Sequence, residues 1–136
     1  MLLGKYNIKY RNSVNLSQQE VIDSYVECDF LVFTSLYEGF GLPIIEAQKV
    51  GRPVITSQID PMMEVAGSGA LLVDPYDVQD IRRGISEIIE NQALRQLLID
   101  EGQKNATKFD PEYSAAQHLK IYRSMMKTQG NNFTTK

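Results

Sequence analysis

The 136-residue chain has one cysteine, one histidine and a net charge of −3. A single cysteine excludes a disulfide framework within the chain. No stretch reaches the run of about 18 apolar residues that is typical of a membrane span, and the apolar start is too short for a secretory signal. The slightly acidic balance provides no basic patch for nucleic acid or for anionic lipid. These absences favour a globular cytoplasmic domain.

The sequence also offers little for metal or nucleophilic chemistry. It contains no Asp-x-Asp pattern, and a lone His118 cannot form a metal site without partners. We therefore expect no metal, and a structural or exposed role for His118. Cys28 comes just before an apolar run, where a small buried thiol is a more common finding than a nucleophile.

Short β-favouring runs alternate with helical patterns, which is typical of an α/β fold with a parallel, Rossmann-like sheet flanked by helices. We expect strands at 8–10, 30–33, 54–56 and 70–73. Helices are expected from the capping box of Ser17 and Glu20, at 43–50, near 62–65, after Asp77, at 93–107 and at 111–127. The helix after Asp77 should bury a stripe formed by Ile81, Ile85, Ile88 and Ile89.

One domain is expected for this length, spanning 1–129. The polar residues 130–136 are expected to form a frayed tail.

The segment Glu-Gly-Phe-Gly-Leu-Pro-Ile-Ile-Glu, from Glu38 to Glu46, lies just beyond the apolar run at 30–33, which we expect to be a strand buried on both faces with residues 34–41 as its outgoing loop. Pro43 suits the first turn of a helix because its missing N–H would be unpaired there, so a helix should begin at Pro43 and stop at Gly51. Ligands bind beyond the carboxyl ends of parallel strands, where helix N-termini attract anions. A diphosphate fits this place.

Each residue of this segment has an ordinary explanation, since loop glycines and exposed glutamates are common. The combination is more specific. Gly39 and Gly41 permit positive φ and a close approach of the backbone to a ligand, while Glu38 and Glu46 carry acceptors that match pairs of sugar hydroxyls. The segment therefore predicts a nucleotide-sugar site.

Glu38 and Glu46 have the spacing of a Glu-x7-Glu signature, and on these residues the chain resembles the family 4 (group 1) retaining glycosyltransferases. The segments 25–29, 34–37, 51–55, 61–65 and 70–77 follow the family's order, and the resemblance extends from about Ile8 to about Tyr122. Enzymes of this family have two Rossmann-like halves, in the arrangement called GT-B. The resemblance implies that this chain is the later part of the second, donor-binding half.

The resemblance also implies roles for single residues. Glu38 would face the transferred sugar as the catalytic residue, and Glu46 would accept hydrogen bonds from the ribose hydroxyls. Backbone N–H groups that would hold sugar and phosphate oxygens belong to Gly39, Phe40, Gly41 and Leu42. Asn12 lies in a segment that resembles the family's strand and loop beside the nucleotide base, at a position where glycine is usual. No cofactor is implied, because the nucleotide-diphosphate sugar is a substrate.

Several parts of the family pattern have no counterpart in the chain: the Gly-rich turn, the Arg and Lys that neutralise the donor diphosphate, and the acceptor-binding half with its histidine. Lys5, Lys9 and Arg11 do not occupy the family's basic positions, and we interpret them as solvated surface. We therefore expect the chain alone to be inactive and to need its missing half or a partner chain.

Two functions of different classes follow. The first is the donor-binding portion of a glycosyltransferase in polysaccharide or lipopolysaccharide assembly, cytoplasmic or peripheral to the inner face of the membrane. The alternative is a non-catalytic binding or assembly module, such as one piece of a split transferase. In both, an incomplete sheet would leave an open strand edge through which the chain could self-associate. The sequence specifies neither the base, the sugar nor the acceptor.

Overall fold

The computed structural model describes residues 5–129, and its centre is a three-stranded parallel sheet in the order β1-β2-β3. The strands are β1 (Leu31–Phe33), β2 (Val54–Ser57) and β3 (Leu71–Val73). Leu31 lies opposite Val54, and Ile55 lies opposite Leu71. Every residue of the central strand β2 is buried. The predicted parallel α/β sheet is therefore confirmed.

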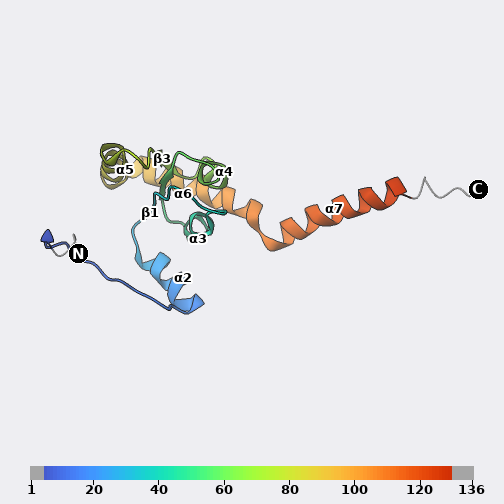
Figure 1. The fold of residues 1–136 in the computed structure, drawn as a ribbon, viewed down its shortest axis with the longest axis horizontal. Helices are drawn as coiled ribbons and strands as arrows, with labels where there is room; N and C mark the ends of the chain where they lie inside the picture. The colour runs from blue at the N-terminus through green and yellow to red at the C-terminus, as the bar shows by residue number, and fades with distance from the viewer. Residues whose placement is uncertain (1–4, 130–136) are drawn as a thin grey trace, which may run out of the picture.

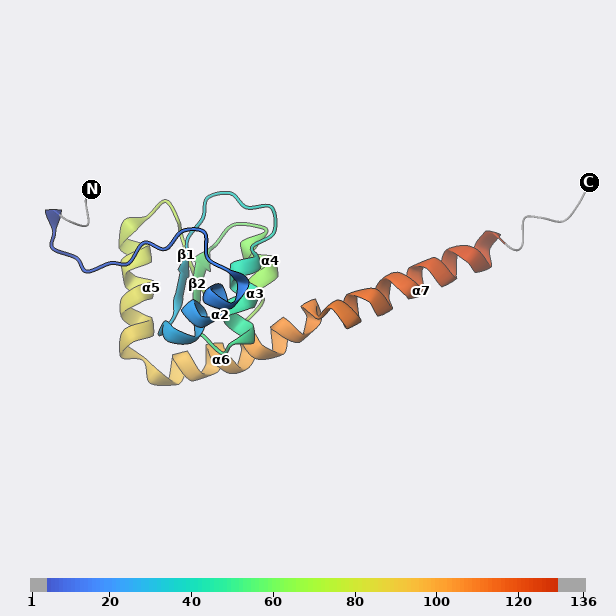
Figure 2. The same ribbon diagram turned by 90° about the horizontal axis from the view of Figure 1, so that it is seen from below.

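Helices cover both faces of this sheet (Figures 1 and 2). The helices are α2 (Gln18–Glu27), α3 (Leu42–Lys49), α4 (Met62–Ala66), α5 (Val78–Glu90), α6 (Gln92–Ala106) and α7 (Pro111–Gln129), with a 3-10 turn η1 (Thr107–Phe109) before α7. Val54 packs in one apolar cluster with residues of α3 and α4, and the next residue, Ile55, packs in a second cluster with Ile88 of α5 and Leu98 of α6. Successive strand residues point to opposite faces, so β2 joins the two clusters.

Two parts of the chain lie outside this body (Figures 1 and 2). The segment before α2 runs along the outside of the molecule, and α7 projects away from it as a long arm. Most side chains of α7 are exposed as far as Met126. Among residues 5–129, no helix combines the length and apolar character needed to cross a membrane.

The predicted helix boundaries are close to the observed ones because local side-chain chemistry sets them. Ser17 Oγ accepts a hydrogen bond from Glu20 N at 3.3 Å, and Glu20 Oε2 accepts one from Ser17 N at 2.8 Å, which completes the capping box. Gly51, just beyond α3, has φ +70°, as expected for a glycine that ends a helix.

Three structural expectations are wrong. Residues 8–10 form no strand, and Ile8 and Tyr10 are about half exposed, because their alternating pattern finds no sheet edge in the structure. The first strand was expected to be buried on both faces, but β1 is buried on one face only, and Val32 on the other face is 40% exposed. The reason is that β1 is an edge strand and α5 packs on β3 instead. Ile89 is 60% exposed, since it lies one position beyond the buried stripe of α5. The predicted tail 130–136 lies outside the described residues.

Candidate functional site

The loop at 34–41 leaves the carboxyl end of β1 and leads into α3, on the side of the sheet where α4 also begins (Figure 2). Two buried hydroxyls of β2 fasten the base of this loop. Thr56 Oγ1 donates to the Phe33 carbonyl at 2.8 Å, and Ser57 Oγ donates to the Ser35 carbonyl at 2.6 Å. The loop therefore begins from a fixed position at the sheet edge.

Glu38 is half-buried within this loop, and its Oε1 accepts a hydrogen bond from Ser35 Oγ at 2.8 Å. Because Ser35 is itself held by Ser57, the Glu38 carboxylate is tied indirectly to the central strand. The sequence predicted the position of Glu38 in the loop, but it did not predict this support.

The two motif glycines differ in conformation. Gly41 is the N-cap of α3 with φ +101°, and a Cβ there would lie 3.3 Å from Ile44 Cδ1. Both glycines permit positive φ, as noted from the sequence; Gly41 adopts it and Gly39 does not. Gly39 is exposed, and a Cβ there would meet nothing within 4 Å, so the space beside its backbone is open.

The N-terminus of α3 is suited to an anion. Its first turn leaves backbone N–H groups without partners inside the helix and carries the positive end of the helix dipole. No acidic residue occurs in that turn, so no side chain of the helix neutralises it.

Glu46 lies on α3 with an exposed side chain, and its Oε2 accepts a hydrogen bond from the hydroxyl of Tyr25 on α2 at 2.9 Å. Burial, this hydrogen bond and the charge of the carboxylate raise the pKa of Tyr25 above its usual range. In the sequence, Tyr25 was indicated only as part of the segment 25–29 that follows the family's order, and nothing in that segment pairs it with Glu46.

Glu46 also lines a hollow of about 350 Å³ between α3 and the start of α7. Its lining residues are Phe40, Leu42, Ile45, Glu46, Lys49, Lys108, Phe109, Pro111 and Ser114. The Phe40 and Phe109 rings form one wall, packed edge to face with centroids 5.9 Å apart. The structure thus brings together three predicted site residues, and it adds two lysines that the sequence analysis did not connect with the motif.

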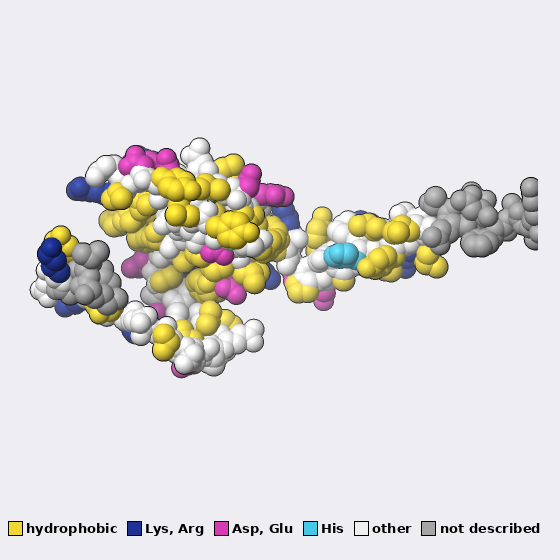
Figure 3. Space-filling view, viewed as in Figure 1, with side chains coloured by type: hydrophobic (Ala, Val, Ile, Leu, Met, Phe, Trp, Pro, Cys, Tyr) yellow, Lys and Arg dark blue, Asp and Glu magenta, His cyan; other side chains and the backbone are white. Residues whose placement is uncertain are grey.

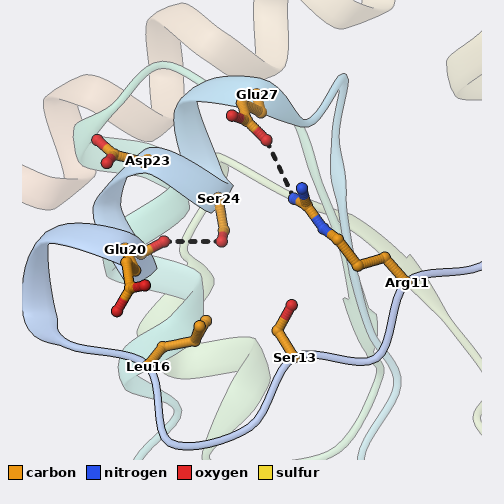
Figure 4. A pocket seen from close by; sticks show the side chains of 7 residues that line it. All are labelled: Arg11, Ser13, Leu16, Glu20, Asp23, Ser24 and Glu27. Atoms are coloured by element: carbon orange, nitrogen blue, oxygen red, sulfur yellow. Dashed lines mark hydrogen bonds and ion pairs between the residues drawn. The ribbon is translucent and has the colours of Figure 1, made fainter.

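Asn12 is not among the residues that line this hollow. It is exposed, in the segment before α2, and its neighbours Arg11 and Ser13 line a different hollow against that helix (Figure 4). There Arg11 forms an exposed ion pair with Glu27 at 3.0 Å. Such pairs contribute little to stability, which agrees with the expectation that Arg11 is solvated surface.

The remaining candidates lie apart from the motif loop. His118 is exposed on α7, with Nδ1 2.9 Å from the Ser114 carbonyl. Cys28 is partly buried and donates from Sγ to the Tyr25 carbonyl at 3.3 Å. Within the described part of the chain, no three His, Cys, Asp or Glu side chains gather where they could hold a metal ion.

Comparison with known proteins assigns the family. The model of the family described as "Glycosyl transferases group 1" matches residues 5–105. The chain belongs to this family. It is 34% identical over 99 residues to O-antigen chain mannosyltransferase B of Escherichia coli, a match that covers 73% of this chain and 26% of that protein. It is 31% identical over 124 residues to MMP alpha-(1->4)-mannosyltransferase of Mycolicibacterium hassiacum, covering 88% of this chain and 30% of that one.

Solved structures of similar proteins agree with the fold. Sucrose-phosphate synthase from Thermosynechococcus elongatus aligns with a TM-score of 0.77 and 26% identity, over 93% of this chain and 33% of that one. Anabaena HepE, solved in complex with UDP and glucose, aligns with a TM-score of 0.64 and 25% identity, over 76% and 29% of the two chains. The predicted class, a Rossmann-like part of a GT-B fold, is confirmed. This chain therefore spans between a quarter and a third of the length of these proteins.

Proposed function

We propose that this chain is the donor-binding portion of a retaining, family 4 glycosyltransferase that moves a sugar from a nucleotide-diphosphate sugar to an acceptor. The observation that carries the proposal is the pair Glu38 and Glu46. One carboxylate lies in the loop after β1 and the other lies on the following helix, with the left-handed Gly41 between them. The UDP and glucose bound in the HepE structure support this choice of donor.

In this proposal the two carboxylates bind different parts of the donor. Glu46 accepts hydrogen bonds from the ribose hydroxyls, and Glu38 faces the transferred sugar. The backbone N–H groups of residues 39–42 hold sugar and phosphate oxygens. The positive end of the α3 dipole stabilises the charge that develops on the leaving diphosphate.

The process and the partner are proposed on the same basis. In this proposal residues 1–129 are part of the donor domain, and transfer also requires the missing acceptor-binding half or a partner chain, so the chain alone is inactive. The name of the O-antigen chain mannosyltransferase supports a role in polysaccharide or lipopolysaccharide assembly. The complete enzyme, in this proposal, acts in the cytoplasm or peripheral to the inner face of the membrane.

A non-catalytic assembly module is the second candidate, and the exposed apolar side chains of α7 favour it. They include Leu119, Ile121, Tyr122, Met125 and Met126, each between 47% and 74% exposed. Figure 3 shows hydrophobic side chains along this arm, away from the body of the molecule. Contact with a partner chain would cover them.

Donor binding is tested by ligand-observed NMR of the purified chain with UDP-, GDP- and ADP-sugars, for the wild type and Glu46→Ala. Hydrogen bonds to a charged group contribute about 1.5–3 kcal/mol, so Glu46→Ala should weaken binding of the preferred donor about tenfold or more. Glu90→Ala is the matched control, because Glu90 is exposed on α5 and its side chain makes no hydrogen bond or ion pair with any residue from 5 to 129. Equal donor affinity for Glu46→Ala and Glu90→Ala would contradict the proposal.

A further inference from the structure

Tyr25 contacts the proposed ribose-binding carboxylate from a helix outside the motif. Its hydroxyl donates to Glu46 Oε2 at 2.9 Å, which joins α2 to α3 across 21 positions of sequence. A carboxylate has about four acceptor positions on its two oxygens. One donor on Oε2 therefore leaves the group able to accept further hydrogen bonds from a ligand.

Tyr25 is held more firmly than Glu46. Its ring packs against the apolar cluster of α3 and α4, whereas the Glu46 side chain is exposed. Arg52 fastens the backbone of α2 at the same point, because its Nε donates to the Tyr25 carbonyl at 3.1 Å and its Nη2 donates to the Val26 carbonyl.

The Tyr25 hydroxyl is a donor near neutral pH, as an ordinary tyrosine is, and burial and the Glu46 carboxylate raise its pKa further above the usual range. A free glutamate on a helix surface samples several rotamers, and ordering it is part of the cost of binding. A fixed donor on one of its oxygens reduces that cost before the ligand arrives.

We propose that Tyr25 is a positioning residue, whose hydroxyl holds the Glu46 carboxylate in the orientation that accepts the ribose hydroxyls of the donor. This inference rests on the proposed function, because it requires that Glu46 binds ribose. The simpler explanation is that the Tyr25–Glu46 hydrogen bond only fastens α2 to α3. The two explanations predict different effects on ligand binding.

A double-mutant cycle distinguishes them. Binding of UDP, GDP and ADP to the full chain is titrated for the wild type, Tyr25→Phe, Glu46→Ala and the double variant. If Tyr25 acts through Glu46, Tyr25→Phe weakens the preferred nucleotide about three- to tenfold, and the double variant binds no more weakly than Glu46→Ala. Tyr122→Phe, which alters an exposed tyrosine of α7, should bind as the wild type does.

The same titrations are repeated with the 2′,3′-dideoxy nucleotide, which lacks the ribose hydroxyls. If the Tyr25–Glu46 hydrogen bond is only structural, the effect of Tyr25→Phe should be the same with and without these hydroxyls. If Tyr25 positions Glu46, Tyr25→Phe and the wild type should bind the dideoxy nucleotide equally. Circular dichroism and urea unfolding check that each variant is folded. If Tyr25→Phe does not fold, Tyr25→Met repeats the cycle with a flexible apolar side chain that also lacks the hydroxyl.

The outcomes separate this inference from the proposed function. If Glu46→Ala weakens binding and Tyr25→Phe does not, the positioning role is overturned and the proposed function stands. The positioning role is also overturned if the losses of binding free energy in the two single variants add up in the double variant. It is overturned as well if Tyr25→Phe weakens binding of the dideoxy nucleotide. If the wild type binds no nucleotide, or Glu46→Ala changes nothing, the proposed function fails and this inference fails with it.

Discussion

Gln48→Leu tests the buried polar contacts that hold the motif helix α3 in place. Gln48 is 1% exposed, and its Nε2 donates to the Ala66 carbonyl at 2.9 Å and to the Gly69 carbonyl at 3.2 Å. Its Oε1 accepts from Asn105 Nδ2 at 3.0 Å, and the same Nδ2 donates to the Val65 carbonyl at 2.8 Å. These bonds connect α3, α4 and α6.

Leucine has a similar volume but neither donates nor accepts hydrogen bonds. The Ala66 carbonyl would still accept from Gly69 N at 3.1 Å, so the groups that lose a partner are the Gly69 carbonyl and one N–H of Asn105. Each buried polar group left unpaired costs about 1–3 kcal/mol. Two such groups together predict that Gln48→Leu lowers the free energy of unfolding by about 2–6 kcal/mol, a large share of the total for a small domain.

The assay is urea unfolding followed by far-UV circular dichroism. Gln58→Leu is the control, because Gln58 is exposed just beyond β2, and it should change the free energy of unfolding by less than about 0.5 kcal/mol. If Gln48→Leu were no less stable than Gln58→Leu, the hydrogen bonds of Gln48 would not be what holds α3 against α4 and α6.

Three further changes test other contacts. Gly84→Ala places a Cβ 2.7 Å from Val73 Cγ1 between α5 and β3, so urea unfolding should show a loss of about 1–3 kcal/mol. Ser17→Ala removes the side-chain acceptor of the α2 cap, so amide hydrogen exchange in α2 should accelerate about fivefold. Because folding raises the pKa of Tyr25 above its unfolded value near 10, stability should fall as the pH rises above about 10, and Tyr25→Phe should remove that part of the fall.

Each of these changes has a contradicting result. Gly84→Ala should be less stable than Ser86→Ala, an exposed change on the same helix, and equal stability would contradict the close packing of α5 on β3. Unchanged exchange in α2 would contradict the role of the Ser17 cap. The same alkaline loss in Tyr25→Phe and in Tyr122→Phe would contradict a raised pKa of Tyr25 as its cause.

The sequence was most informative where local chemistry determines structure. The capping box at Ser17, the glycine after α3 and the apolar runs of β2 and β3 are short-range signals, and all of them are confirmed. The prediction of a strand at 8–10 was wrong. The alternation of apolar and polar side chains there is a local signal, but a strand also needs a neighbouring strand to pair with. The burial of Val32 and Ile89 depends on which helix covers which strand, and side-chain periodicity does not specify that.

The candidate site was predictable only in part. The position of the loop and helix from Glu38 to Glu46 follows from the apolar run before it, Pro43 and Gly51. The hydrogen bond of Tyr25 to Glu46 and that of Asn105 to Gln48 join residues 21 and 57 positions apart. Neither pair has a periodic signal, because each depends on how two helices pack in space.

The most direct test of the account is a titration of the ¹⁵N-labelled chain with the nucleotide sugar that it prefers, followed by ¹H–¹⁵N correlation spectra. We predict that the largest shifts fall on the backbone amides of Gly39, Phe40, Gly41 and Leu42, at the N-terminus of α3. Shifts confined to the hollow between Arg11 and α2, or no shifts with any of the three donors, would contradict the claim that this loop binds a nucleotide sugar.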